Sequence, residues 1–268
     1  MKITLADEVG TKLFGKLYAK DHLRSDRWYK LFRTLVYGRL EDESTFSSVR
    51  RLVQYEDYLL RLMHGAGIPT ARPYGFVEIT PEREYLLVTE FFDGAIEIGD
   101  AEITDEVIDD AMSVVRQVWD AGLAHRDVKP ANVLVRDGRV LFIDVAFAEV
   151  RRSPWRQAVD LANMMLVLAL GSRPEHVYER ALHYFTADEI GEAFAATRGI
   201  ALTSQLRARM KSDGRDLVAD FRLLAPPAPP IHLQRWSLRR LALTTSVAIT
   251  AIVLVNLVVT TFQGASLL

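Results

Sequence analysis

Hydrophobic and polar residues alternate along residues 1–20, with a break near residues 7–10. A period of two residues is typical of a β-strand with one buried face. We therefore expect a β-hairpin whose second strand runs from Lys12 to Tyr18 and carries Lys16. Further strand-like runs, rich in apolar and β-branched residues, occupy residues 85–89, 133–135 and 141–143.

Longer segments show apolar residues at helical spacing, and residues 48–64 are the most informative of them. Glu56 falls inside the apolar stripe of this predicted helix. A carboxylate on a buried face is costly unless a cation pairs with it, so the pattern indicates a basic partner for Glu56. Other helices are predicted at residues 104–121, capped by Thr104, at residues 161–170, opened by Asp160, and as short helices within residues 177–224.

Residues 23–36 form a basic amphipathic segment with two interpretations. It is either a helix packed on the N-terminal part of the protein or a surface that contacts anionic lipid.

Composition excludes several classes of function. The chain has no cysteine, which rules out disulfides, thiolate catalysis and the usual zinc sites. Its net charge of -2 points to neither nucleic acid nor an acidic partner. No apolar core segment of a signal peptide is visible at the start.

The C-terminal part differs in character from the rest. A proline-rich stretch at residues 225–230 predicts a stiff, extended linker, and three arginines and Trp236 follow it. Residues 241–261 are apolar apart from Thr, Ser and Asn256, which predicts one transmembrane helix. The basic flank places the preceding domain in the cytoplasm. The alternative for residues 241–261 is a buried core helix.

The densest group of chemically active residues lies at the centre of the chain, in His125-Arg126-Asp127-Val128-Lys129-Pro130-Ala131-Asn132. The strand-like run after it and the next one are joined by a tight turn at residues 136–139, which predicts a hairpin. Asn132 precedes the first strand and Asp144 follows the second, so both lie at the same end of the hairpin. Their oxygen atoms suit a divalent cation.

These residues resemble the catalytic motifs of the protein-kinase-like superfamily, where His-Arg-Asp is followed by Asn and a metal-binding Asp comes later. The resemblance implies that ATP and Mg²⁺ are the cofactors. It assigns Asp127 to the acceptor hydroxyl, Lys129 to charge on the transferred phosphoryl, and Asn132 and Asp144 to the metal.

The same resemblance assigns the nucleotide contacts. Lys16 would hold the α- and β-phosphates, with Glu56 fixing its position. Thr89 would lie behind the nucleotide, and the backbone from Glu90 to Phe92 would meet the base. Asp160 would buttress the catalytic loop, or would simply cap its helix.

The chain also departs from the superfamily's pattern. We find no Gly-rich loop before the first hairpin, Phe14 replaces the usual Ala two residues before Lys16, and Val145-Ala146 replaces Phe-Gly after Asp144. The segment between Asp144 and Asp160 is short. In this respect the chain resembles RIO-type, lipopolysaccharide and aminoglycoside kinases more than regulated Ser/Thr kinases. Its arrangement resembles bacterial proteins that join a kinase-like domain to a lysylphosphatidylglycerol-synthase-type membrane region.

The expected fold is therefore α+β: a two-lobed protein-kinase-like fold followed by one transmembrane helix. The expected parts are a small lobe at 1–94, a large lobe at 95–224, a linker and interface segment at 225–240 and the span at 241–261. The expected function is phosphoryl transfer from ATP to a hydroxyl of a protein, a lipid head group or a small molecule. The alternative is a non-catalytic nucleotide-binding module that regulates a membrane partner.

Overall fold

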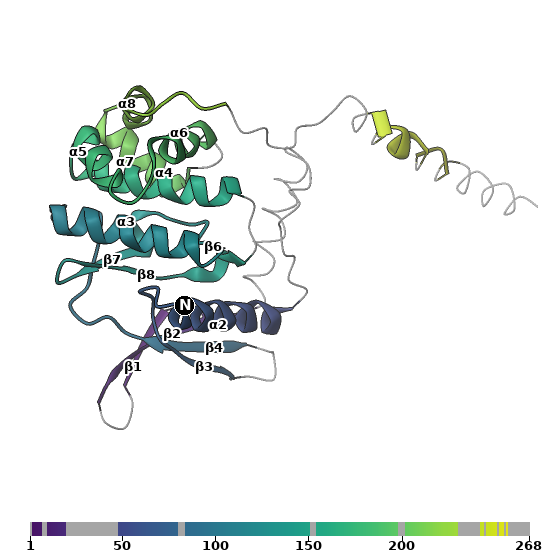
Figure 1. The fold of residues 1–268 in the computed structure, drawn as a ribbon. Coiled ribbons are helices and arrows are strands. Elements are labelled where there is room, and N and C mark those ends of the chain that lie inside the picture. Colours follow the sequence, from purple (N-terminus) through teal and green to yellow (C-terminus); the bar gives the residue numbers. More distant parts are fainter. Residues whose placement is uncertain are drawn as a thin grey trace, which may run out of the picture. The chain divides into compact units, whose positions relative to one another are not determined.

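The structure, a computed structural model, has a mixed α+β fold with a small sheet-rich region and a larger set of helices (Figure 1). It describes residues 2–6, 10–19, 48–79, 84–150, 154–197 and 202–229, and parts of 242–256. Contacts group residues 1–26 with 44–231 in one unit, and residues 27–43 with 232–268 in another. The α+β class expected from the sequence is confirmed.

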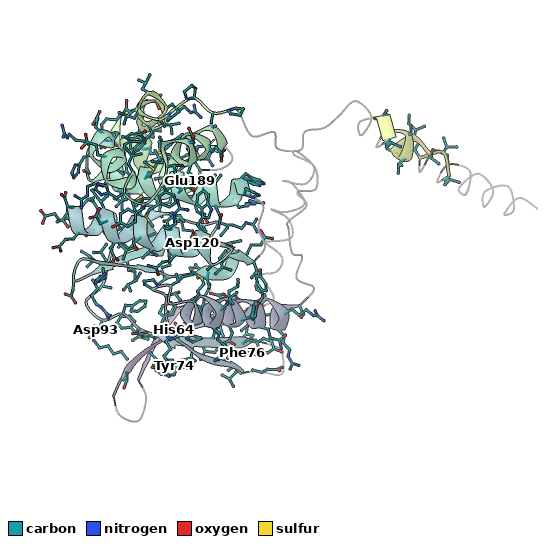
Figure 2. All side chains as sticks on the ribbon, viewed as in Figure 1. His64, Tyr74, Phe76, Asp93, Asp120 and Glu189 are labelled. Atoms are coloured by element: carbon teal, nitrogen blue, oxygen red, sulfur yellow. The ribbon has the colours of Figure 1, made fainter. Side chains whose placement is uncertain are left out.

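A four-stranded antiparallel sheet forms the N-terminal region, with strand order β1-β2-β4-β3 (Figure 1). The predicted hairpin and the strand predicted at 85–89 are both present. Register places Phe14 opposite Thr89 and Lys16 opposite Leu87. Tyr74 and Phe76 lie on β3 at the edge of this sheet (Figure 2). The strands are β1 (Lys2–Ala6), β2 (Lys12–Tyr18), β3 (Pro73–Glu78) and β4 (Tyr85–Glu90).

Helix α2 (Val49–Gly65) packs against β3 and β4 and confirms the helix predicted at 48–64. Ser48 caps it, because its side chain accepts a hydrogen bond of 3.3 Å from the Arg51 amide. The buried face carries Glu56, which is 3% exposed, among aliphatic residues and a methionine. The carboxylate therefore lies where the sequence pattern placed it.

Helix α3 (Asp105–Asp120) begins after Thr104, whose side chain accepts from the Val107 amide as predicted. Its apolar face lies in the main core. On its other side, Asp110 accepts a 2.7 Å hydrogen bond from the Val140 amide and pairs with Arg139. This ties α3 to the hairpin that follows.

That hairpin consists of β7 (Val133–Arg136) and β8 (Arg139–Phe142), with β5 (Ile96–Glu97) beside β7. The turn residues Asp137 and Gly138 have φ values of 51° and 73°, as a two-residue type I′ turn requires. At the open end, the Ile143 amide donates to the Asn132 carbonyl at 3.0 Å. The predicted hairpin is confirmed, and Asn132 and Asp144 lie at the same end of it.

Five helices complete the described part of this unit, and α4 lies at their centre with neither face exposed over most of its length. Contrary to our prediction, this helix does not open at Asp160 but begins at Pro154, which suits a first helical position. Asp160 therefore lies inside the helix and does not cap it. The helices are α4 (Pro154–Leu170), α5 (Pro174–Ala181), α6 (Ala187–Ala196), α7 (Ser204–Asp213) and α8 (Leu217–Leu224).

The proline-rich stretch packs against α6 where it begins. Ala225 is 6% exposed, and a Cβ added at Gly191 of α6 would lie only 2.5 Å from the carbonyl oxygen of Pro226. Glycine at position 191 thus allows the backbone of this stretch to approach the helix closely. The described start of the predicted linker is part of the packed unit.

Two predicted segments lie wholly or partly outside the described residues. The basic amphipathic segment 23–36 is one of them. Of the span predicted at 241–261, the structure describes residues 242–243, 245–250, 252–254 and 256, which are helical. No helix among the described residues combines the length and the apolar character needed to cross a membrane. The predicted transmembrane helix is therefore not supported.

Candidate active site

Three of the predicted site residues form one cluster between β2, α2 and the end of the hairpin. Lys16 Nζ lies 3.0 Å from Glu56 Oε1 and 2.6 Å from Asp144 Oδ1. In the sequence, Glu56 lies 40 residues after Lys16, and Asp144 lies 128 residues after it. The tertiary structure thus provides the basic partner that the position of Glu56 required.

Burial and the neighbouring charges shift the pKa values of these three side chains in opposite directions. Burial lowers the pKa of Lys16, but the carboxylates of Glu56 and Asp144 outweigh it and hold that pKa above its usual value. Burial raises the pKa of Glu56, although Lys16 opposes the rise. Burial also disfavours ionisation of Asp144, yet the charge and hydrogen bond of Lys16 bring the pKa of Asp144 below its usual value. Lys16 therefore stays cationic beside an ionised Asp144.

Asp144 has a left-handed backbone conformation, which determines the direction of its side chain. Its φ of 58° and ψ of 64° lie in the left-handed region, which Asp adopts more readily than most residues. A short 3₁₀ helix, η2 (Val145–Phe147), follows directly. Asp144 therefore forms a sharp corner between β8 and η2, although Val145 and Ala146 replace the Phe-Gly of the superfamily motif.

The second cluster lies in the loop before the hairpin. Asp127 Oδ2 accepts a 2.5 Å hydrogen bond from Lys129 Nζ and a 2.8 Å hydrogen bond from Asn132 Nδ2. Asn132 Nδ2 also donates to the Asp127 carbonyl at 2.9 Å. Asn132 belongs to the 3₁₀ helix η1 (Pro130–Asn132) and is 4% exposed. The residues predicted for the catalytic loop are thus brought together around one carboxylate.

His125 fastens this loop to the end of β8. It is fully buried, its Nδ1 accepts from the Asp127 amide at 3.4 Å, and its Nε2 lies 3.2 Å from the Ile143 carbonyl. Nδ1 can accept only when unprotonated, so Nε2 carries the hydrogen and donates to Ile143. Burial lowers the pKa of His125 and favours this neutral form. One imidazole therefore links the backbones of Asp127 and of the residue before Asp144.

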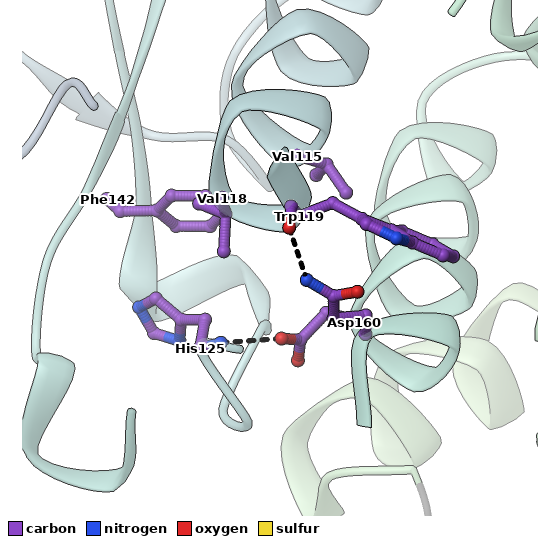
Figure 3. Close-up of a pocket in the computed structure, with 7 residues that line it drawn as sticks. Val115, Val118, Trp119, His125, Phe142 and Asp160 are labelled. Atoms are coloured by element: carbon purple, nitrogen blue, oxygen red, sulfur yellow. Dashed lines mark hydrogen bonds between the residues drawn. The ribbon is translucent and has the colours of Figure 1, made fainter. Parts of the chain in front are cut away.

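Asp160 supports the same loop from α4. Its carboxylate accepts from the His125 amide at 2.6 Å (Figure 3) and also from the Arg126 amide at 2.9 Å, as the resemblance implied. Burial raises the pKa of Asp160 to about 7, although these two amides oppose the rise. Beside it lies a cavity of about 10 Å³, lined by Val115, Val118, Trp119, His125, Phe142, Gln157 and Asp160 (Figure 3).

The predicted nucleotide-base contacts lie around the end of β4. Thr89 is 6% exposed, and its hydroxyl donates to the Glu90 carbonyl at 3.4 Å. The Glu90 amide donates to the Arg72 carbonyl at 2.9 Å, so a ligand that met the Glu90 backbone would share its carbonyl with the Thr89 hydroxyl. Phe92 packs with Ala71 and Leu141 in a small apolar cluster separate from the main core.

The donor set fits MgATP. Asn132 uses its amide nitrogen towards Asp127, so its amide oxygen is the atom that could bind a cation together with the Asp144 carboxylate. Among the described residues, no three His, Asp or Glu side chains gather closely enough to hold a metal by themselves. Mg²⁺ is typically bound by one or two carboxylates together with substrate phosphates and water, which matches this arrangement.

Sequence reasoning missed four residues that hold the site together. Tyr55 donates to the Ala148 carbonyl at 3.2 Å, and Arg126 pairs with Glu149 at 3.2 Å. The Ala131 amide donates to Gln205 Oε1 of α7 at 3.2 Å. The available signals were the position of Tyr55 directly before Glu56 and the place of Arg126 inside the predicted catalytic-loop motif. Nothing in the sequence connects Gln205 with a loop 74 residues away.

Comparison with known proteins finds one distant similarity. No family model matches the chain. Over 220 residues, 78% of its length, the chain is 22% identical to "Serine/threonine-protein kinase D" of Synechocystis sp., and it spans 42% of that protein's length. The similarity supports a relationship to the kinase-like superfamily at most. A join to a lysylphosphatidylglycerol-synthase-like membrane region is not supported.

Proposed function

We propose that this protein transfers the γ-phosphoryl group of ATP to a hydroxyl acceptor. The observation that carries the proposal is the arrangement of two clusters at one end of one hairpin. Lys16, Glu56 and Asp144 form the first, and Asp127, Lys129 and Asn132 form the second. His125 connects the two clusters through the backbone. The distant kinase relative supports the same chemistry.

We assign each residue a separate role in the reaction. MgATP supplies the phosphoryl group and the cationic charge that stabilises it in transfer. Lys16 would contact the α- and β-phosphates, while Asp144 and the amide oxygen of Asn132 would hold the metal. The acceptor hydroxyl loses its proton as its oxygen bonds to phosphorus and the bond to the ADP oxygen breaks.

Asp127 receives or orients that proton. Its Oδ2 already accepts from Lys129 and Asn132, so we assign the proton to Oδ1. Lys129 binds the Asp127 carboxylate and would also stabilise the negative charge of the incoming phosphoryl group. The proposed acceptor is a hydroxyl of a protein Ser or Thr, of a lipid head group or of a small molecule, and the name of the relative favours the first.

Labelled ATP tests the proposal directly. Full-length protein is incubated with labelled ATP and Mg²⁺, separately with membranes and with soluble extract, and phosphate uptake into each fraction is measured. Asp127→Asn is expected to lower transfer at least about a hundredfold, the usual minimum contribution of a positioned general base. Asp188→Asn is the control, because Asp188 is an exposed aspartate on α6. Transfer by Asp127→Asn at the wild-type rate would refute the assignment.

A second function, a non-catalytic nucleotide-binding module, is favoured by one observation. Phe14 lies two residues before Lys16 on β2, and therefore on the same strand face, where the superfamily usually carries Ala. A bulky ring there narrows the space beside the nucleotide. Tight Mg²⁺-dependent binding of ATP without turnover by the full-length protein would select this function.

Attachment to a membrane with the kinase-like part in the cytoplasm remains a proposal from the apolar composition of residues 241–261 and their basic flank. It would place the site near lipid head groups and membrane proteins, and it is independent of the chemistry proposed above.

A further inference from the structure

Helix α2 contacts the segment after β8 through two neighbouring residues. Glu56 binds Lys16, which binds Asp144 at the start of that segment. Tyr55, one residue earlier on the helix, donates its hydroxyl to the carbonyl of Ala148 at 3.2 Å. Asp144 and Ala148 flank η2 at its two ends, so these contacts join one helix to both ends of one 3₁₀ turn.

The acceptor of the Tyr55 hydrogen bond is held firmly from the other side. Glu149, the next residue, lies in β9 (Glu149–Val150) and pairs with Ala124 of β6 (Leu123–Ala124). Its carboxylate, in a residue 8% exposed, binds Arg126 at 3.2 Å. The Arg126 amide in turn donates to Asp160. These contacts hold the Ala148 carbonyl in place, so its hydrogen bond with Tyr55 can fix the position of α2.

Tyr55 is suited to remain a donor. Its ring is half-buried, and burial followed by the nearby Glu149 carboxylate raises the pKa of the phenol, so the hydroxyl stays protonated at ordinary pH. Tyr58, one turn further along α2, is 51% exposed, with its ring centroid 6.5 Å from that of Tyr55. The helix therefore offers a matched tyrosine for comparison.

We propose that Tyr55 is a positioning residue that sets α2 against the Ala148 carbonyl, and thereby holds Glu56 and Lys16 in the geometry that grips the nucleotide phosphates. The inference rests on the proposed function, because it assigns Lys16 to phosphate. Lys16 holds phosphates alike before and during transfer. Loosening it should therefore raise the KM for MgATP and leave kcat nearly unchanged.

Chemical labelling of lysines tests the inference without nucleotide. Full-length wild type, Tyr55→Phe and Tyr58→Phe are treated briefly with acetic anhydride, and the labelling rate of Lys16 is measured by mass spectrometry relative to Lys12. Lys16 is the less exposed of the two, with 20% of its side chain exposed against 55%. Tyr55→Phe loses the hydrogen bond to Ala148 and the backbone hydrogen bond with Val150, which predicts a rise of about threefold to tenfold in the Lys16 rate, and Tyr58→Phe should cause no change.

The second readout is steady-state kinetics with MgATP. Tyr55→Phe is expected to raise KM by a similar factor of about threefold to tenfold, while kcat changes by less than about twofold. An unchanged Lys16 rate, an equal rise in Tyr58→Phe, or an unchanged KM overturns the inference, and a lower melting temperature alone would show a purely structural role. If the wild type neither binds nor turns over ATP, the proposed function fails, and the labelling comparison still decides the role of Tyr55.

Discussion

Replacing Asp144 by Asn is expected to lower phosphoryl transfer by at least about a thousandfold, because catalysis of this type depends almost entirely on positioning and charge. The substitution removes the anionic oxygen that lies 2.6 Å from Lys16 and that is assigned to the metal. Asn is chosen because Asp144 has a left-handed backbone, which Asn tolerates and Ala does not. Loss of activity can then be attributed to the charge and not to backbone strain.

The hairpin provides a matched control for this experiment. Asp137 also has a positive φ, 51°, but lies in the turn at the opposite end of the same hairpin. Asp137→Asn should retain full activity. Melting temperatures of both variants and the wild type should be measured alongside transfer of label from ATP. An Asp144→Asn protein that is folded and transfers phosphate at the wild-type rate would contradict the assignment of Asp144 to the metal.

Replacing Asp160 by Leu is expected to lower the free energy of unfolding by about 2–6 kcal/mol at pH 5, since one buried and one partly buried backbone amide lose their acceptor. These are the amides of His125 and Arg126, next to Asp127. Transfer activity should fall as well, because the loop that carries Asp127 is no longer tied to α4. Denaturant unfolding and the transfer assay measure the two effects.

The effect of Asp160→Leu on stability should depend on pH. The pKa of Asp160 is raised from 3.8 to about 7, so the folded protein keeps a proton that the unfolded chain releases above pH 4. The stability from this proton is complete below about pH 4 and is lost as pH rises through about 7, so the difference from the Leu variant narrows over that range. Asp120→Leu, at an exposed position on α3, is the control. A difference that widens with pH would show that Asp160 is ionised when buried.

Local sequence was sufficient to predict most of the secondary structure near the site. The tight turn predicted at residues 136–139 contains two residues that accept positive φ, Asp137 and Gly138, and the predicted cap Thr104 has a side chain that accepts from a backbone amide. The apolar stripe of α2 identified Glu56 as a buried carboxylate. Each of these depends on residues a few positions apart, which a sequence pattern can capture.

Other features were predicted wrongly or were not predicted, because they depend on residues that are far apart in the chain. The start of α4 was predicted at residue 161, seven residues too late, because packing against α3 and α6 buries polar residues such as Gln157 that look like loop residues in the sequence. The first residues of the proline-rich stretch, Ala225 and Pro226, pack on α6, where Gly191 leaves room for them, and this contact was not predicted. Both outcomes depend on neighbours that are distant in the chain.

From the sequence alone we could identify the charged and oxygen-bearing side chains of the candidate site, the two strands of the hairpin, and the need of Glu56 for a cation. The tertiary structure decided that the cation is Lys16, that Asp144 shares it, and that Tyr55, Asp160 and His125 hold the surrounding backbone. The physical reason is that hydrogen bonds along a turn or helix depend on local spacing. The energy of a buried ion pair depends instead on which distant side chains the packed core brings within about 3 Å of each other.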